Sequence, residues 1–335
     1  MTGATRALRT LAVQSFTLET GEVLRDLTQA YHLDGTLNAR RDNLVIVFHA
    51  LTGSADAAGD WWKRVVGPGL AVDTTRWAVL APNLLGSCYG TTGPSDRPGE
   101  AFPAVTPRDQ MRFAALLVES LGVRDVALAA GGSLGGMVAL EWAVEFSGRT
   151  RATVVLAAPA AHTAHAIAWN AVQRACLGSA GDEGVAIARQ IAMISFRSER
   201  EFEARFGRAA DREGRFAVAG YLAHHGEKLA ARFDAATYRT LLDAMDAHDV
   251  GRSRGGVTCA LQGLRDVVYA VGIAGDQLYS AGVVRQWATQ AGAEYREIDS
   301  IHGHDGFLLE HEQVGDILRE ALHAATRSGA ARGAA

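Results

Sequence analysis

The sequence predicts a mostly parallel β-sheet covered by helices on both faces, with a helical segment inserted between two parts of the sheet. Short runs of aliphatic and β-branched residues alternate with helical patterns along the chain. Each run ends in a loop that carries polar residues or glycine, and in a parallel sheet such loops gather at one edge, where active sites form. The predicted strands are residues 44–48, 77–80, 126–130, 152–156 and 267–274.

Further elements flank this alternating pattern. Residues 10–18 and 27–31 are expected to form an antiparallel ribbon at the sheet edge. Residues 294–298 are a candidate last strand before the final helix.

The chain changes character between residues 160 and 256, where helical stretches rich in Ala, Arg and Glu replace the β-branched runs. This segment is far longer than a usual connection between helix and strand, which favours a separate cap. Connecting helices packed on the sheet are the alternative. We therefore divide the chain into a first part of the core (1–159), a cap or lid (160–256), a second part of the core (257–325) and a flexible tail (326–335).

The composition fits a soluble globular enzyme. Of the 335 residues, 48% are hydrophobic and 21% are charged, which is enough for a sizeable core. The net charge of −4 gives no general attraction to nucleic acid or to an anionic membrane, so neither partner is expected. Cys88, Cys176 and Cys259 are widely spaced and predict neither a disulfide framework nor a zinc site. Without an apolar signal segment, a reducing cytoplasm is the expected location.

A nucleophile elbow is predicted at residues 131–135, Gly-Gly-Ser-Leu-Gly. This motif follows the apolar run 126–130 and opens a helix-forming stretch, so Ser133 falls on a sharp strand-to-helix turn. Small flanking residues allow the strained backbone of such a turn, and the helix N-terminus stabilises negative charge. Ser133 is therefore a candidate nucleophile, although glycine-rich turns of this kind also bind phosphate groups.

A serine nucleophile needs a histidine base, and the histidine needs a carboxylate to orient it. Asp276 follows the strand 267–274 and is expected at its carboxyl end, whereas Asp266 precedes that strand. His304 lies in a loop between the candidate strand 294–298 and the final helix. The chain order Ser133, Asp276, His304 is that of the α/β-hydrolase fold.

His302 and His304 also suggest a metal site, but no third ligand accompanies them at a recognisable spacing. A loop hydrogen bond is the preferred role for His302, and no metal is expected.

The loop after residues 44–48 is a candidate for the oxyanion hole. In this fold that loop supplies one backbone N–H group, and the residue after the nucleophile supplies the other. The donors here are the amides of Leu51 and Leu134. An ordinary turn rich in small residues is the alternative.

Taken together, the sequence resembles the homoserine O-acyltransferase family of methionine biosynthesis, whose members are most often acetyl-CoA-dependent homoserine O-acetyltransferases. The resemblance spans almost the whole chain. Its motifs are residues 49–53 (HALTG), 61–62 with 66–69, 83–94 (NLLGSCYGTTGP), 132–137 (GSLGGM) with 140–143, 206–208, 232–234, 245–246 and 303–308 (GHDGFL).

The resemblance implies a ping-pong acyl transfer. Ser133 would take an acetyl group from acetyl-CoA, which is a co-substrate and not a bound cofactor, and pass it to the γ-hydroxyl of L-homoserine. Arg189 would bind the homoserine carboxylate and Asp305 its ammonium; without the family, a solvated Arg189 and a helix-capping Asp305 are equally good interpretations. Members of the family are commonly homodimers joined through their caps.

Several positions depart from the family pattern. Phe196 stands where the family often has Tyr, Leu134 where it usually has Met, and Gly306 where Ala is common; the segment 177–182 is short. These changes leave open whether the acyl group is acetyl or succinyl and whether the acceptor is homoserine or serine. An esterase or thioesterase with the same triad is a further alternative, as is a non-catalytic binding protein.

Overall fold

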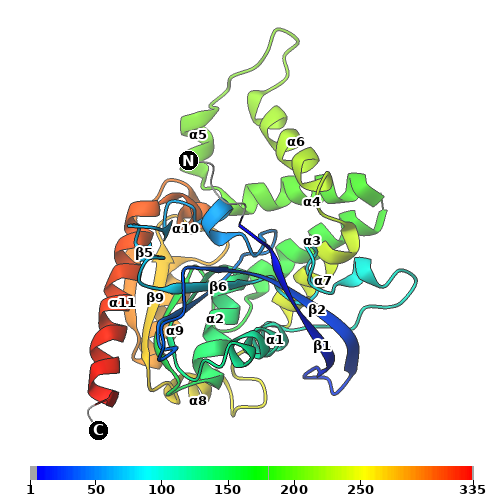
Figure 1. Ribbon diagram of the computed structural model, residues 1–335. Helices are drawn as coiled ribbons and strands as arrows, with labels where there is room; N and C mark the ends of the chain where they lie inside the picture. Colours follow the sequence, from blue (N-terminus) through cyan, green and yellow to red (C-terminus); the bar gives the residue numbers. More distant parts are fainter. Residues whose placement is uncertain (1–5, 180, 334–335) are drawn as a thin grey trace.

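The computed structural model describes residues 6–179 and 181–333. Its centre is an eight-stranded sheet with the strand order β1-β2-β6-β3-β7-β8-β9-β10 (Figure 1). The six strands from β6 to β10 in this order are parallel, whereas β1 and β2 form an antiparallel ribbon at one edge. The predicted α/β-hydrolase architecture is thereby confirmed. The strands are β1 (Arg9–Thr17), β2 (Val23–Asp34), β3 (Leu44–Phe48), β6 (Ala78–Pro82), β7 (Val126–Gly132), β8 (Thr150–Leu156), β9 (Val267–Ile273) and β10 (Glu294–Ile298).

The central strands are apolar throughout because both faces of the sheet are covered. In β3, Ile46 packs in one core with residues of α1, α2 and α9, while Val45 and Val47 pack in a second core with residues of α11. Burial of such side chains contributes roughly 1.5–3 kcal/mol each. These helices are α1 (Pro107–Ser120), α2 (Leu134–Glu145), α9 (Ala281–Ala291) and α11 (His311–Gly333), with the short α8 (Val257–Gln262) beside α9.

The final helix corrects one expectation. A flexible tail was expected from residue 326, but α11 continues to Gly333, and residues 334–335 lie outside the described residues. Its apolar positions Val314, Leu318, Ala321 and Ala325 follow helical spacing and are buried against the sheet. The turns beyond Ala325 extend a helix that this stripe already anchors.

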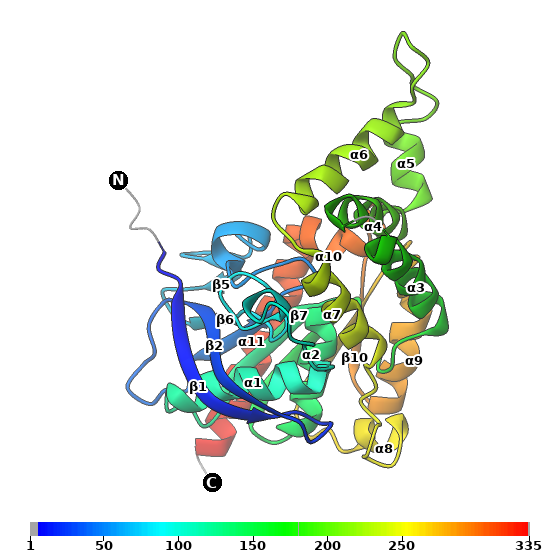
Figure 2. The ribbon, with the colours of Figure 1, turned by 90° about the vertical axis from the view of Figure 1, so that its right-hand side faces the viewer.

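The segment between β8 and α8 is helical. The helices α3 to α7 lie together on one side of the sheet, and the loop between α5 and α6 projects away from the body of the molecule (Figures 1 and 2). We keep the name cap for residues 160–256; its boundaries remain a prediction. The helices are α3 (Ala164–Ser179), α4 (Gly181–Phe196), α5 (Glu199–Arg205), α6 (Ala217–Ala230) and α7 (Ala235–Asp246).

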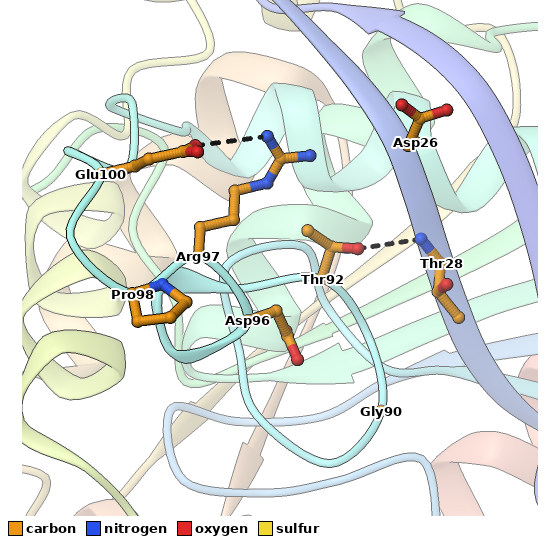
Figure 3. A pocket seen from close by; sticks show the side chains of 8 residues that line it. All are labelled: Asp26, Thr28, Gly90, Thr92, Asp96, Arg97, Pro98 and Glu100. Carbon is orange, nitrogen blue, oxygen red and sulfur yellow. Dashed lines mark hydrogen bonds and ion pairs between the residues drawn. The ribbon is translucent and has the colours of Figure 1, made fainter.

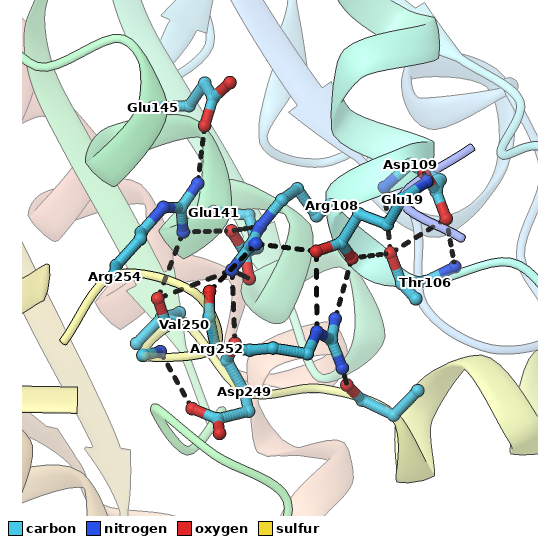
Figure 4. Close-up of polar contacts among 12 residues, drawn as sticks. Glu19, Thr106, Arg108, Asp109, Glu141, Glu145, Asp249, Val250, Arg252 and Arg254 are labelled. Atoms are coloured by element: carbon cyan, nitrogen blue, oxygen red, sulfur yellow. Dashed lines mark hydrogen bonds and ion pairs between the residues drawn. The ribbon is translucent and has the colours of Figure 1, made fainter. Parts of the chain in front are cut away.

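A charged network joins the base of the cap to the core (Figure 4). Arg108 on α1 is only 3% exposed and pairs with Glu141 on α2 (Nε to Oε2, 3.0 Å) and with Glu19 after β1 (Nη1 to Oε1, 2.6 Å). Arg252 and Arg254, on the chain leaving the cap, pair with Glu19 and Glu141. The helix behind the elbow is therefore tied to the cap by paired, mostly buried charges.

The remaining short elements lie in loops. They are the turns Ala57–Trp61, Pro94–Asp96 and Gly303–Asp305, the two-stranded ribbon β4 (Val66–Gly67) and β5 (Val72–Asp73), and α10 (Gly306–Leu309). Within residues 6–179 and 181–333, no helix is both long and apolar enough to cross a membrane.

Candidate active site

Ser133 occupies the turn between β7 and α2 in a strained backbone conformation, with φ +58° and ψ −124°. A positive φ at a residue with a side chain costs on the order of 1–3 kcal/mol, which the surroundings must hold in place. The neighbouring glycines explain how this is possible. A Cβ atom at Gly131 would overlap the carbonyl oxygen of Gly135, and one at Gly135 would overlap the carbonyl oxygen of Phe48. The predicted elbow is present.

The structure brings the three side chains Ser133, Asp276 and His304 together, although 171 residues separate the serine from the histidine. His304 Nε2 lies 2.8 Å from Ser133 Oγ, and His304 Nδ1 lies 2.8 Å from Asp276 Oδ2. The other oxygen of Asp276 accepts hydrogen bonds from the amides of Leu278 and Tyr279. Asp276 is thus held so that one oxygen faces the histidine, an arrangement suited to a serine nucleophile and its base.

His304 is fully enclosed, and its charge is set by its neighbours. Burial lowers the pKa of His304, but the charge and hydrogen bond of Asp276 and the charge of Asp305 outweigh it, so the pKa is raised above its ordinary value. The ring also contacts Tyr279 and Phe307 at centroid distances of 5.3 and 5.6 Å. These rings fix the plane of the imidazole.

The two proposed oxyanion donors belong to the elbow itself and to the loop after β3, the strand that pairs with β7 up to Gly131. Leu134 is the first residue of α2, where the amide has no acceptor within the helix. Leu51 is buried in the loop after β3. That loop is fixed by a residue that sequence reasoning passed over: His49 Nδ1 donates to the carbonyl oxygen of Ala50 (2.8 Å), and His49 Nε2 accepts from the amide of Leu84 (3.0 Å). Burial lowers the pKa of His49 to about 4, so its ring is neutral.

A cavity of about 330 Å³ lies between the cap, the loop after β3 and the residues that follow His304; the triad side chains themselves do not line it. Arg189 on α4 and Asp305 both line it, as the family resemblance requires of an acceptor site. The Arg189 guanidinium lies over the ring of Phe196 (5.4 Å), and this ring lies 5.6 Å from the ring of His304. Asp305 precedes α10 but makes no capping hydrogen bond; it pairs instead with Arg197 (Nε to Oδ2, 3.1 Å).

Positive side chains outnumber negative ones in the lining of the cavity, a feature that was not predicted from the sequence. Arg197, Lys228 and Arg232 line it together with Arg189, facing Asp60 and Asp305. Burial and then the charges of Arg189 and Arg197 lower the pKa of His225 on the same wall to about 4. His225 and Lys228 lie three residues apart on one face of α6, whereas Arg232 lies beyond the end of that helix, so the sequence spacing alone did not group these charges. The cavity suits an anionic ligand.

Comparison with known proteins identifies the family. Residues 43–179 match the family model described as alpha/beta hydrolase fold. A homoserine O-acetyltransferase of Thermobifida fusca (strain YX) is 43% identical over 343 residues, covering 91% of this chain and 90% of the relative. The chain belongs to the homoserine O-acetyltransferase family. A solved homoserine O-acetyltransferase of Staphylococcus aureus is 30% identical with a TM-score of 0.82, covering 94% of this chain and 95% of the other.

The family fold is shared with hydrolases. The crystal structure of esterase E22 has a TM-score of 0.84 but only 19% identity, over 94% of this chain and 99% of the other. That likeness shows the fold alone.

A second hollow, of about 440 Å³, lies between β2 and the loop 90–100, apart from the family's elbow and histidine loop (Figure 3). Two contacts join residues of its lining: Thr92 Oγ1 accepts from the amide of Thr28 (2.8 Å), and Arg97 faces Glu100 (3.8 Å). None of the predicted site residues line it. Within the described residues, no group of three or more His, Cys, Asp or Glu side chains is placed to hold a metal ion.

Proposed function

We propose that the protein transfers an acetyl group from acetyl-CoA to the γ-hydroxyl of L-homoserine, a step of methionine biosynthesis, through an acetyl-Ser133 intermediate. The observation that carries this proposal is the combination of a Ser133–His304–Asp276 hydrogen-bond chain with a cavity that presents both Arg189 and Asp305. The chain supplies a nucleophile and a base. The cavity supplies opposite charges for an amino-acid acceptor.

In the first half-reaction, Ser133 Oγ passes its proton to His304 Nε2 and attacks the thioester carbonyl carbon. The amides of Leu51 and Leu134 stabilise the tetrahedral oxyanion, a contribution worth about 10²–10³ in rate per donor. The carbon–sulfur bond then breaks, and His304 returns the proton to the departing CoA thiolate. Asp276 stabilises the imidazolium that exists between these two proton transfers.

In the second half-reaction, the acceptor hydroxyl passes its proton to His304 and attacks the acetyl-Ser133 ester. The bond to Ser133 Oγ breaks, His304 protonates that oxygen, and O-acetylhomoserine leaves. The bound hydroxyl would be favoured over water because Arg189 and Asp305 hold the acceptor in a cavity that begins at the neighbour of His304.

The charges around the acceptor site fit a zwitterion. Arg189 faces the cavity as a planar cation that matches a carboxylate. Asp305 lines the same cavity, and its carboxylate, paired with Arg197 (Nε to Oδ2, 3.1 Å), is the acidic group available to an ammonium. A simple esterase substrate needs neither charge.

The test is CoA release from acetyl-CoA, followed with a thiol reagent with and without L-homoserine. We expect steady release only with L-homoserine, and we expect succinyl-CoA and L-serine to be poorer substrates in the same assay. Release that is equally fast without an acceptor would instead identify a thioesterase. If the protein preferred succinyl-CoA or L-serine, the proposed mechanism would stand but the proposed donor or acceptor would be wrong.

We also propose that two copies associate through their caps. Five of the exposed large apolar side chains lie on the cap: Ile167, Val172, Ile187, Ile194 and Phe216. Ile187 and Ile194 lie seven residues apart on α4 and so share one helical face, and an exposed apolar face is typical of an interface. Light scattering on the purified protein should give the mass of a dimer, and Ile187→Glu with Ile194→Glu should give a monomer.

The cytoplasm remains the proposed location. Cys88 and Cys259 are free thiols in the structure, as suits a reducing compartment. Cell fractionation with an antibody against the protein would test this.

A further inference from the structure

The corner between α4 and α5, residues 196–201, lies directly against the loop that carries His304. Ser198 Oγ donates a hydrogen bond to the carbonyl oxygen of Ile301, and Glu201 faces His302 (Oε2 to Nδ1, 3.3 Å). Gly303, with φ +62°, lies so close that a Cβ atom there would be 2.8 Å from the amide nitrogen of Ser198. The cap therefore contacts the histidine loop along its whole length, from residue 301 to residue 305.

Arg197 is the charged centre of this contact. Its guanidinium uses two edges: Nε lies 3.1 Å from Asp305 Oδ2, and Nη1 lies 3.0 and 3.1 Å from the two oxygens of Glu201. The side chains of Arg197 and Asp305 are each 13% exposed, so water screens the pair weakly. A lysine has a single charged point and cannot reach both carboxylates in this fork geometry.

Asp305 is the immediate neighbour of His304, so what holds Asp305 also acts on the base. We propose that Arg197 is a positioning residue for acyl transfer: it holds the Asp305 carboxylate in place for the acceptor's ammonium and offsets its negative charge beside His304. The part that concerns the ammonium rests on the proposed function. The part that concerns His304 rests only on the geometry of the triad and its neighbours.

The sign of the effect on His304 follows from the groups that face it. Asp276 faces it from the loop after β9, Asp305 from its own loop, Ser133 and Tyr279 contact it, and Arg189 lies behind Phe196 on α4. The charge of Asp305 raises the pKa of His304. Removing the positive charge of Arg197 leaves that charge uncompensated, so the pKa of His304 rises further.

Three full-length variants test the proposal: Arg197→Met, Arg197→Lys and, as a matched control, Arg200→Met, whose side chain is exposed on α5. Two reactions are measured from pH 5 to 9. Acylation of Ser133 by p-nitrophenyl acetate needs no acceptor, and acetyl transfer from acetyl-CoA to L-homoserine gives the acceptor KM. Thermal unfolding reports whether each variant folds.

We expect Arg197→Met to lose tenfold or more in kcat/KM for L-homoserine and to move the acid limb of the p-nitrophenyl acetate profile to higher pH. Arg197→Lys should return the acid limb to its wild-type position, because the charge is restored, while the acceptor KM stays raised. Arg200→Met should match the wild type in both. If Arg197 had only a structural role, Arg197→Met would not shift the acid limb, and Arg197→Lys would not return it to the wild-type pH.

The proposal is overturned if Arg197→Met leaves the midpoint pH of the acid limb unchanged and keeps kcat/KM for the acceptor within twofold of the wild-type value. It is also overturned if both reactions fall only in proportion to the folded fraction. Should Arg197→Met fail to fold, Arg197→Lys decides the matter, since a wild-type acceptor KM in that variant rejects the positioning role. Failure of the proposed function is a separate result: the wild type would then transfer no acetyl group to L-homoserine, while the effect on p-nitrophenyl acetate would still be measured.

Discussion

The guanidinium of Arg108 on α1 is paired with the carboxylate of Glu141 on α2, and both side chains are almost fully buried. Glu141 lies two turns beyond Ser133 on the helix that the elbow begins. Arg108 also pairs with Glu19 after β1, and Glu141 also pairs with Arg254, so the nucleophile helix is linked to the ribbon edge and to the base of the cap (Figure 4).

Breaking this pair should destabilise the protein. Arg108→Met removes the cation and leaves Glu141 with Arg254 alone, so we expect the free energy of unfolding to fall by about 3 kcal/mol. Urea unfolding measures this change. The control is Arg112→Met, because Arg112 pairs with Glu145 on the same two helices but is well exposed, and its loss should cost about 1 kcal/mol or less. An equal fall in the free energy of unfolding in the two variants would contradict the claim that the buried ion pair contributes more than the exposed one.

The pH dependence of acylation should report the environment of His304. The base must be neutral to accept a proton, and its pKa is raised, so the acid limb of kcat/KM for acetyl-CoA should have its midpoint above 6.5. Asp276→Asn removes the charge that opposes the effect of burial. The acid limb should then move to lower pH, and kcat should fall by about 10⁴-fold. An acid limb that stays in place in this variant would show that another group titrates.

His49 should matter for rate but not for pH dependence. His49→Phe removes both ring hydrogen bonds that fix the loop carrying Leu51, and we expect acylation to slow by about 10²-fold, as for loss of one oxyanion donor. The shape of the pH profile should not change above pH 5, because the ring is already neutral there. His248→Phe is the matched control, another buried neutral histidine, bonded to the carbonyl of Pro159. If both variants slow acylation to the same extent, the effect of His49→Phe does not come from the loss of its hydrogen bonds to the loop that carries Leu51.

Arg189 should act on the acceptor and not on the donor half-reaction. Arg189→Ala removes a charge-assisted interaction with the homoserine carboxylate, worth about 1.5–3 kcal/mol, so the acceptor KM should rise about 10- to 100-fold. The rate of CoA release in a single turnover should be largely kept. An unchanged acceptor KM would show that the carboxylate binds elsewhere, with Arg232 and Lys228 as the next candidates.

The sheet and the triad could be predicted from the sequence because both depend on short motifs and on their order along the chain. Ser133, Asp276 and His304 each follow a recognisable strand, and strand ends in a parallel sheet meet at one edge. The pairing of Arg197 with Asp305 was not predictable in this way. It depends on how the cap lies over the core, and side-chain spacing within α4 and α5 carries no information about that placement.

The end of α11 and the role of His49 were missed for different reasons. The end from residue 326 to residue 335 is rich in Ala, Gly and Arg, which suggested a flexible tail, yet Ala and Arg favour helix once the stripe from Val314 to Ala325 has anchored it. His49 was visible in the motif before Leu51. Its hydrogen bond to the amide of Leu84, which follows β6, needed the three-dimensional structure.

The central claim is that an acetyl group resides on Ser133 between CoA and homoserine. Intact-protein mass spectrometry after mixing with acetyl-CoA tests it most directly. We predict one added acetyl group, located on the peptide that contains Ser133, absent from Ser133→Ala, and lost on addition of L-homoserine as O-acetylhomoserine forms. Product formation by Ser133→Ala at the wild-type rate, or an acetyl group that leaves equally fast with and without L-homoserine, would contradict the account.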